Sequence, residues 1–253
     1  MKKFFTGLFS SARKVRKYNK YLIVPDIHGT YSIYQKVEAY IKEHDEDDRL
    51  VIFLGDYMDR GEPGEIEGKK FNDAGSFYTI RDLIKLRKWA IAKDKDMVFL
   101  RGNHEIFFEN FFIDGSIRAY KQYKFFKNSV ESLEYMMQRD HAFSEDFIVF
   151  LNDLTPYYLD HKNSYLFVHA GIDPKAKDLE QQAKEGIIYW IRDKFILSKQ
   201  KLPYTVVFGH TPFFKPFIKP DKIGLDSGVY RSGFINLLEI NGAHHKIVKL
   251  EAN

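Results

Sequence analysis

The sequence of 253 residues contains no cysteine. This absence excludes disulfides, zinc–thiolate sites and thiol catalysis together, although it leaves the redox compartment undecided. Long apolar runs are also missing. None approaches the roughly 20 residues that a transmembrane helix needs, so we do not expect an integral membrane protein. The net charge of +4 is small for this length, and the chain is long enough to bury a sizeable core.

Positive charge is concentrated at the start of the chain. Residues 1–20 carry lysines and arginines without a single acid. One interpretation is an arm that binds a membrane surface or nucleic acid; the other, which we favour, is a basic leader that packs against the domain edge. The apolar stretch FFTGLF is shorter than the core of a secretory signal, so we expect a cytoplasmic protein. We therefore divide the chain into a basic N-terminal extension, 1–20, and a single domain, 21–253.

Hydrophobic periodicity predicts alternating strands and helices in the first half. YLIVP (21–25), RLVIFL (49–54) and DMVFL (96–100) are typical of buried strands, and residues 31–43 and 77–92 have helical spacing between them. This β-α-β-α-β order predicts parallel pairing with right-handed crossovers. The aromatic-rich middle, about 105–150, predicts a helical cap on the sheet. Its basic stretch 118–129 could instead stack on nucleic-acid bases, a reading that we rank lower.

The second half returns to strands at 165–168 and 204–208, followed by short strands with close turns. We expect these strands to form a second, mixed or antiparallel sheet. The segment 61–75, GEPGEIEGKKFNDAG, is polar, rich in glycine and too long for a plain connector.

Five predicted strands end in side chains that bind metals. They lie in the motifs DIHG (26–29), GDYMDRG (55–61), RGNHE (101–105), HAG (169–171) and GHT (209–211). Oxygen and imidazole ligands without thiolates suit manganese, iron, zinc or magnesium in a hydrolytic centre. The ligands exceed what one ion takes, so two ions that share a carboxylate are expected. Such a site explains how Asp56 tolerates its position, because it would face two dications.

This ordered set of motifs resembles the phosphoprotein phosphatase branch of the calcineurin-like metallophosphoesterase superfamily. The resemblance runs from about residue 21 to 230 and is closest to small bacterial and phage members, which include protein phosphatases and diadenosine tetraphosphatases. It implies an α/β fold of four layers, with a central β-sandwich of mixed sheets flanked by helices. It also implies a dinuclear metal site at the carboxyl ends of the strands, so that 21–253 would be one metallophosphoesterase domain.

The resemblance assigns ligands to two divalent ions, for which manganese is our first choice and iron, zinc and magnesium also fit. A hydroxide between them would attack phosphorus directly. The first metal would be held by Asp26, His28 and the bridging Asp56. The second would be held by Asp56, Asn103, His169 and His210.

The same resemblance assigns the catalytic and phosphate-binding side chains. His104 matches the general acid, and Asp59 matches the carboxylate that orients it. Arg60, together with Asn103, would bind the substrate phosphate. Arg192, in IIYWIRDKF (187–195), matches a second phosphate-binding arginine; the alternative is a surface salt bridge with a neighbouring acid.

Three further residues near the motifs receive weaker assignments. Glu105 is expected to be a structural partner of a loop backbone. Asp226, in LDSG (225–228), is a candidate support for the metal ligands. Arg101 either contacts phosphate or braces its loop, and the sequence leaves both alternatives open.

The leading hypothesis is a phosphatase of phosphoserine and phosphothreonine in proteins, active also on small aryl phosphates. The alternative is a bis(5'-nucleosyl)tetraphosphatase that cleaves diadenosine tetraphosphate. Segment 61–75 departs from the compact G-P-x-S of many relatives, and its acids are expected to disfavour highly charged nucleotides. A silent relative that binds a phosphorylated partner is disfavoured by the intact ligand set. We expect no nucleic-acid partner, and contact between the basic N-terminus and a membrane surface is ranked low.

Overall fold

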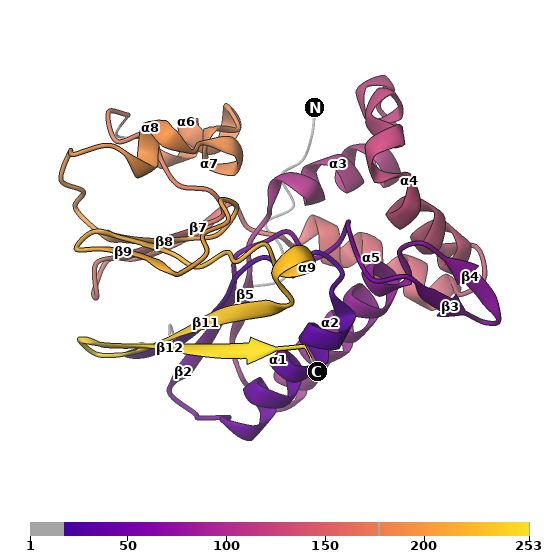
Figure 1. Cartoon of the computed structure of the whole chain (residues 1–253), viewed down its shortest axis with the longest axis horizontal. Helices are drawn as coiled ribbons and strands as arrows, with labels where there is room; N and C mark the ends of the chain where they lie inside the picture. Colours follow the sequence, from indigo (N-terminus) through magenta and orange to yellow (C-terminus); the bar gives the residue numbers. More distant parts are fainter. Residues whose placement is uncertain (1–17, 177, 253) are drawn as a thin grey trace.

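The computed structural model of the chain describes residues 18–176 and 178–252 (Figure 1). Nearly all of the expected N-terminal extension, residues 1–17, lies outside the described residues, so neither interpretation of it is tested. Two five-stranded sheets pack face to face, and helices cover the outer face of each (Figure 1). This arrangement confirms the expected four-layer sandwich. No helix in the described ranges is long and apolar enough to cross a membrane.

The first sheet combines the predicted parallel strands with a C-terminal hairpin. Its order is β12 (His244–Glu251), β11 (Phe234–Asn241), β1 (Lys20–Val24), β2 (Arg49–Phe53) and β5 (Met97–Phe99). β1, β2 and β5 are parallel. Helices α1 (Tyr31–Glu43) and α2 (Ala74–Ala92) make the two crossovers, which confirms the predicted β-α-β-α-β unit.

The second sheet is mixed, as expected. Its order is β6 (Tyr157–Asp160), β7 (Tyr165–Val168), β8 (Thr205–Phe208), β10 (Lys222–Gly224) and β9 (Phe217–Lys219). β7, β8 and β10 run parallel, and the two edge strands are antiparallel.

The expectation that all C-terminal strands join the second sheet was wrong, because β11 pairs antiparallel with β1 instead. Its sequence shows why a central place suits it. Ile235 and Leu237 are buried on the helix side, and Leu238 and Ile240 are buried between the sheets. A strand with two apolar faces needs cover on both sides, and this position in the first sheet provides it.

Side chains along β1 alternate between the two faces of the first sheet and pack against the layer on each side. Tyr21 and Ile23 point between the sheets, where they pack with Phe167 and other apolar side chains, whereas Leu22 and Val24 face the helices. Each fully buried aliphatic side chain contributes roughly 1.5–3 kcal/mol, so this five-residue strand stabilises both sides of the sandwich. The rigid sheet in turn fixes where its strand-end loops begin.

The predicted helical cap consists of α3 (Asn103–Phe112), α4 (Ile117–Met137) and α5 (His141–Asn152). Segment 61–75 forms a hairpin of β3 (Gly64–Ile66) and β4 (Lys69–Phe71). Asp73 then caps α2 by accepting the backbone N–H of Ser76 at 2.8 Å. The second sheet is covered by α6 (Leu179–Lys184), α7 (Ile187–Trp190) and α8 (Asp193–Ile196), and the short α9 (Val229–Ser232) precedes β11.

Candidate metal centre

Loops from both sheets converge at the carboxyl ends of their strands. The predicted ligands on these loops are all at most 5% exposed: Asp26, His28, Asp56, Asn103, His169 and His210. Hydrogen bonds join the loops directly. The backbone N–H of His28 donates to the carbonyl of Asp56 at 2.9 Å, and Nδ1 of His169 lies 2.9 Å from the carbonyl oxygen of Leu54. The sequence-predicted ligands are therefore brought together in one buried cluster.

Several site residues have left-handed backbone conformations. The φ angles of His28, Asp56 and His210 are 48°, 52° and 61°, and those of Asp59 and Arg60 are also positive. Such angles are uncommon for residues with a Cβ and cost on the order of 1–3 kcal/mol each. These angles turn the backbone sharply after each strand, so that the side chain of each site residue stays at the strand end.

Two glycines allow the loops to approach the carboxylates. A Cβ on Gly102 would overlap Oδ1 of Asp56, and a Cβ on Gly209 would overlap Oδ1 of Asp26. The glycines of GNHE and GHT are thus required by close packing against the site, whereas the adjoining Asn103 and His210 carry the chemistry.

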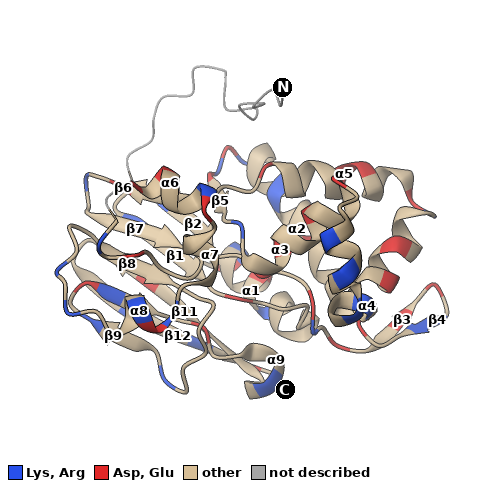
Figure 2. Cartoon of the chain, turned by 90° about the horizontal axis from the view of Figure 1, so that it is seen from above, with Lys and Arg blue, Asp and Glu red and all other residues tan. Residues whose placement is uncertain are grey.

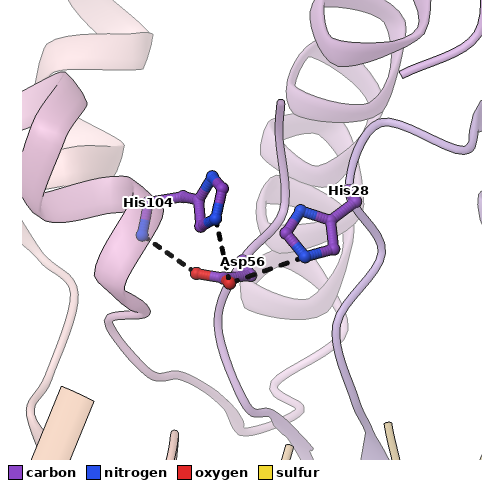
Figure 3. A group of neighbouring side chains, drawn as sticks. All are labelled: His28, Asp56 and His104. Carbon is purple, nitrogen blue, oxygen red and sulfur yellow. Dashed lines mark hydrogen bonds and ion pairs between the residues drawn. The ribbon is translucent and has the colours of Figure 1, made fainter. Parts of the chain in front are cut away.

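Asp56 lies at the centre of two groups of candidate ligands. One group consists of His28, Asp56 and His104 (Figure 3), and the other of Asp56, His169 and His210; the donor atoms within each lie within 4.8 Å of one another. Oδ2 of Asp56 is 3.6 Å from Nε2 of His28 and 3.5 Å from Nε2 of His169. A carboxylate shared by two groups is the arrangement that a bridging ligand requires.

Asp26 occupies a less central position than its expected role suggests. Its Oδ2 lies 4.0 Å from Nε2 of His28, and its two oxygens accept the backbone N–H of His210 at 3.0 and 3.1 Å. In the first group it is His104 that approaches His28 and Asp56. The assignment of Asp26 to the first metal stays a prediction.

Burial keeps the imidazoles neutral and ready to coordinate. It lowers the pKa of His28 to about 3 and that of His210 to about 2, and it also lowers the pKa of His169. Near pH 7 their nitrogen lone pairs are therefore available. Nε2 of His210 is buried without a hydrogen-bond partner in the described part of the chain. A bound metal ion would be a suitable partner for the lone pair of this nitrogen.

The pKa values of the two aspartates in the cluster are shifted in opposite directions. Burial and the charges of Asp226 and Asp56 raise the pKa of Asp26 well above its ordinary value. Burial also acts to raise the pKa of Asp56, but the surrounding histidines outweigh it and the net shift is downward. Since His28 and His210 are neutral near pH 7, a bound cation would add to the positive charge that ionised Asp56 faces. The donor set therefore fits two divalent metal ions.

A histidine–carboxylate pair lies beside the cluster. Nδ1 of His104 is 3.0 Å from Oδ2 of Asp59, which is within the distance of an ion pair. The ring N–H does not point at this oxygen well enough for a regular hydrogen bond. Burial acts to lower the pKa of His104, but the charges of Asp56 and Asp59 dominate and raise it. Oδ1 of Asp59 accepts the hydroxyl of Ser129 at 3.2 Å. The geometry provides an imidazole that can carry a proton.

The comparisons with known proteins agree with this site. The model of the family described as calcineurin-like phosphoesterase matches residues 20–243. The chain belongs to this family. Its members are metal-dependent phosphoester hydrolases with a dinuclear divalent metal centre. The expected superfamily and fold are thereby confirmed, and the histidine and aspartate groups of this phosphoesterase are its candidate metal ligands.

Solved structures share the fold of the phosphoesterase at low sequence identity. A proposed diadenosine tetraphosphatase is 18% identical with a TM-score of 0.55, over 91% of this chain and 93% of that one. A serine/threonine phosphatase from Saccharomyces cerevisiae, similar to human PP5, is 15% identical with a TM-score of 0.55, over 94% of this chain and 81% of that one. A comparison with curated protein sequences found no match.

Both predicted phosphate-binding arginines of the phosphoesterase lie at the site. Nη2 of Arg60 is 3.4 Å from Nε2 of His104. Nη1 of Arg192 donates to the hydroxyl of Thr211 at 3.4 Å, and its charge contributes to the lowered pKa of His210. Among the described residues no ion pair joins Arg192 to a neighbouring acid, so the salt-bridge alternative is not favoured.

The structure also shows the partners of two residues with weaker assignments. Glu105 accepts the backbone N–H groups of Asp56, Tyr57 and Gly102 at 2.8 to 3.0 Å, which confirms its structural role in the phosphoesterase. Nε of Arg101 donates to Glu109 at 2.6 Å, so this arginine ties the loop before α3 to that helix, and its contact with phosphate stays a prediction.

Sequence reasoning missed two residues of the phosphoesterase site. The ring of Tyr230 lies 4.8 Å from the guanidinium carbon of Arg60 and 5.3 Å from the ring of His28. Ser129, from the middle of α4, contacts Asp59. Neither lies in a strand-end motif, and only the packing of α4 and α9 against the loops brings them there.

Proposed function

We propose that the phosphoesterase hydrolyses phosphoserine and phosphothreonine in proteins and also accepts small aryl phosphates. The pair of His104 and Asp59 beside Asp56 is the observation that supports this proposal. A serine or threonine alkoxide is a poor leaving group unless it receives a proton. The raised pKa of His104 increases the fraction that carries a proton near neutral pH, which suits such a substrate.

Each neighbouring side chain then has a defined part. Arg60 and Arg192 would hold the phosphate, with Asn103 beside them, and Asp59 would keep the imidazole of His104 oriented. When bound, two divalent ions would supply activated water and offset the negative charge of the phosphate. The residues proposed to hold them are Asp26, His28, Asp56, Asn103, His169 and His210.

Hydrolysis of diadenosine tetraphosphate is the second candidate, and one observation favours it. Trp190 is 57% exposed, and its ring lies 6.0 Å from that of His210, where it could stack on an adenine. The acids of segment 61–75 should repel nucleotides less than expected, because three of them already have partners within the protein. Glu62 accepts from Ser32, Glu67 pairs with Arg139 and Asp73 caps α2.

The deciding experiment compares kcat/KM of the manganese-loaded protein on a phosphothreonine peptide and on diadenosine tetraphosphate. We expect the peptide to be preferred. His104→Asn should slow peptide hydrolysis by roughly 10²- to 10⁴-fold and dinucleotide cleavage much less, because a nucleotide leaving group depends less on protonation. A strong preference for the dinucleotide would replace the proposed substrate by the second candidate.

A further inference from the structure

The first half of α4 exposes cations that have no acidic partner. Arg118, Lys121 and Lys124 are exposed, and within the described ranges none forms an ion pair. No acid occurs between Asp114 and Glu131, so this part of the helix is wholly basic. Figure 2 shows the blue segments along α4. These cations are therefore available to an external anion.

Large apolar side chains are exposed among the same cations. Ile117, Tyr120 and Phe125 are 77%, 61% and 69% exposed. Nζ of Lys124 lies 4.9 Å from the centre of the Phe125 ring. Three exposed apolar side chains on a few turns of helix are more than single surface hydrophobics, and such patches mark interaction sites.

This surface runs into the catalytic pair. Arg118, Gln122, Phe125 and Ser129 follow the i, i+4, i+7, i+11 spacing of one helix face. Ser129 contacts Asp59, and the Phe126 ring beside it lies 5.3 Å from that of His104. With a rise of about 1.5 Å per residue, Lys121 lies about 12 Å and Arg118 about 16 Å along the helix from Ser129.

We propose that Arg118, Lys121, Lys124 and Phe125, the α4 docking face, bind an acidic segment of the phosphoprotein substrate. This inference rests on the proposed protein phosphatase function. An extended peptide advances about 3.3 Å per residue. The acids that meet these cations therefore lie about three to five residues from the phosphorylated residue.

The position of the face favours an acidic peptide over other anions. A ligand that uses this stripe must also reach the cleft, because the stripe ends at Ser129 and Asp59. Acidic residues that continue from a phosphorylated serine or threonine satisfy both conditions in one chain. A membrane surface or a nucleic acid bound only through the cations would have no reason to be aligned with the catalytic pair.

The test measures kcat and KM on diadenosine tetraphosphate and on three further kinds of substrate. They are a small aryl phosphate, a neutral phosphothreonine peptide and the same peptide with glutamates three to five residues from the phosphothreonine, on either side in separate peptides. The variant R118Q/K121Q/K124Q removes the cations, and K93Q/K184Q/K199Q removes three exposed lysines elsewhere that form no ion pair in the described part of the chain. The two variants have the same net charge, so they separate a local contact from the general field of the protein.

In the wild type we expect one acidic peptide to exceed the neutral peptide in kcat/KM by roughly threefold to hundredfold, because three exposed ion pairs each add a small factor. The α4 variant should lose this preference through a raised KM with kcat unchanged, and the control should retain it. Activity on the aryl phosphate should stay unchanged in both variants. Raising the salt concentration should reduce the preference in the wild type and in the control, and it should change the α4 variant little.

Several results would overturn the proposal. Equal kcat/KM on acidic and neutral peptides would refute the docking face but leave the protein phosphatase function intact. A loss of preference shared by the control variant would refute a local contact. Turnover of the aryl phosphate without hydrolysis of any peptide would overturn the proposed substrate and the docking face together. A defect of the α4 variant on diadenosine tetraphosphate, but not on peptides, would assign the face to nucleotides.

Discussion

The strand-end loops and the first half of α4 border the same site but differ in burial, in backbone conformation and in the environment of their charges. The loop residues are buried, several have left-handed backbone angles, and their carboxylates and imidazoles lie within a few ångströms of one another. Arg118, Lys121 and Lys124 of α4 are exposed, lie on a regular helix and form no ion pair within the described ranges. Strain and unbalanced charge are tolerated in the loops because the rigid sandwich holds them.

This difference separates chemistry from selection. Residues that hold metals and move protons need fixed distances, which a buried loop on a rigid sheet provides. Residues that choose among substrates need access to solvent and tolerate small movements. We therefore expect substitutions in the loops to abolish turnover and substitutions on α4 to change which substrate is turned over.

The largest effect is expected for Asp56→Asn. An amide cannot supply the negative charge that two dications share, so we expect loss of bound metal together with loss of activity by several orders of magnitude. Elemental analysis of the purified variant measures the metal directly, and circular dichroism checks the fold. Glu65→Gln, an exposed acid of the β3–β4 hairpin, is the matched control. Full metal occupancy in Asp56→Asn would contradict the bridging assignment.

His104→Asn should lower turnover by roughly 10²- to 10⁴-fold while two metals per chain remain. His104 lies in the same group as His28 and Asp56, so a ligand role is a real alternative. Metal content after dialysis distinguishes the two. A drop to one ion per chain would make His104 a ligand and leave the protonation step without its donor.

Ser129→Ala tests whether α4 also acts on the chemistry. The hydroxyl of Ser129 donates to Oδ1 of Asp59 and so helps to hold the carboxylate whose other oxygen faces His104, and a hydrogen bond to a charged group contributes roughly 1.5–3 kcal/mol. Without it the carboxylate can move away from Nδ1 of His104, which would lower the pKa of the imidazole, so the fall of activity at high pH should begin at a lower pH. We expect turnover to fall about tenfold. Ser132→Ala, one turn further along α4, is the control. An unchanged pH profile in Ser129→Ala would contradict an effect of α4 on the protonation of His104.

Tyr230→Leu should have the smallest effect. The ring contributes a cation–π contact to Arg60 worth roughly 0.5–1 kcal/mol at a partly exposed site. We expect KM for an aryl phosphate to rise about two- to fivefold with kcat nearly unchanged. Tyr230→Phe should restore wild-type KM, because it keeps the ring. A fall in kcat with constant KM would show that Tyr230 acts on His28 rather than on Arg60.

Local patterns predicted the first half of the fold well. The helix expected at 31–43 has those bounds, and the strands before each motif are β1, β2 and β5. The error lay in β11 and β12, because a two-sided apolar strand reveals that it is central but not which sheet receives it. Likewise, GEPGEIEGKKFNDAG was recognised as unusual, but its hairpin depends on packing against α2 and α4.

The sequence by itself determined the candidate ligand types and their order, because strands that end in aspartate, asparagine or histidine bring short side chains to one sheet edge. It also determined the glycines next to them, since only glycine permits the close approach to Asp26 and Asp56. The tertiary structure alone decided that Ser129 and Tyr230 join the site and that Arg118, Lys121 and Lys124 form no ion pair with an acid of the described chain. These contacts join residues far apart in the chain, and no local periodicity or spacing encodes them.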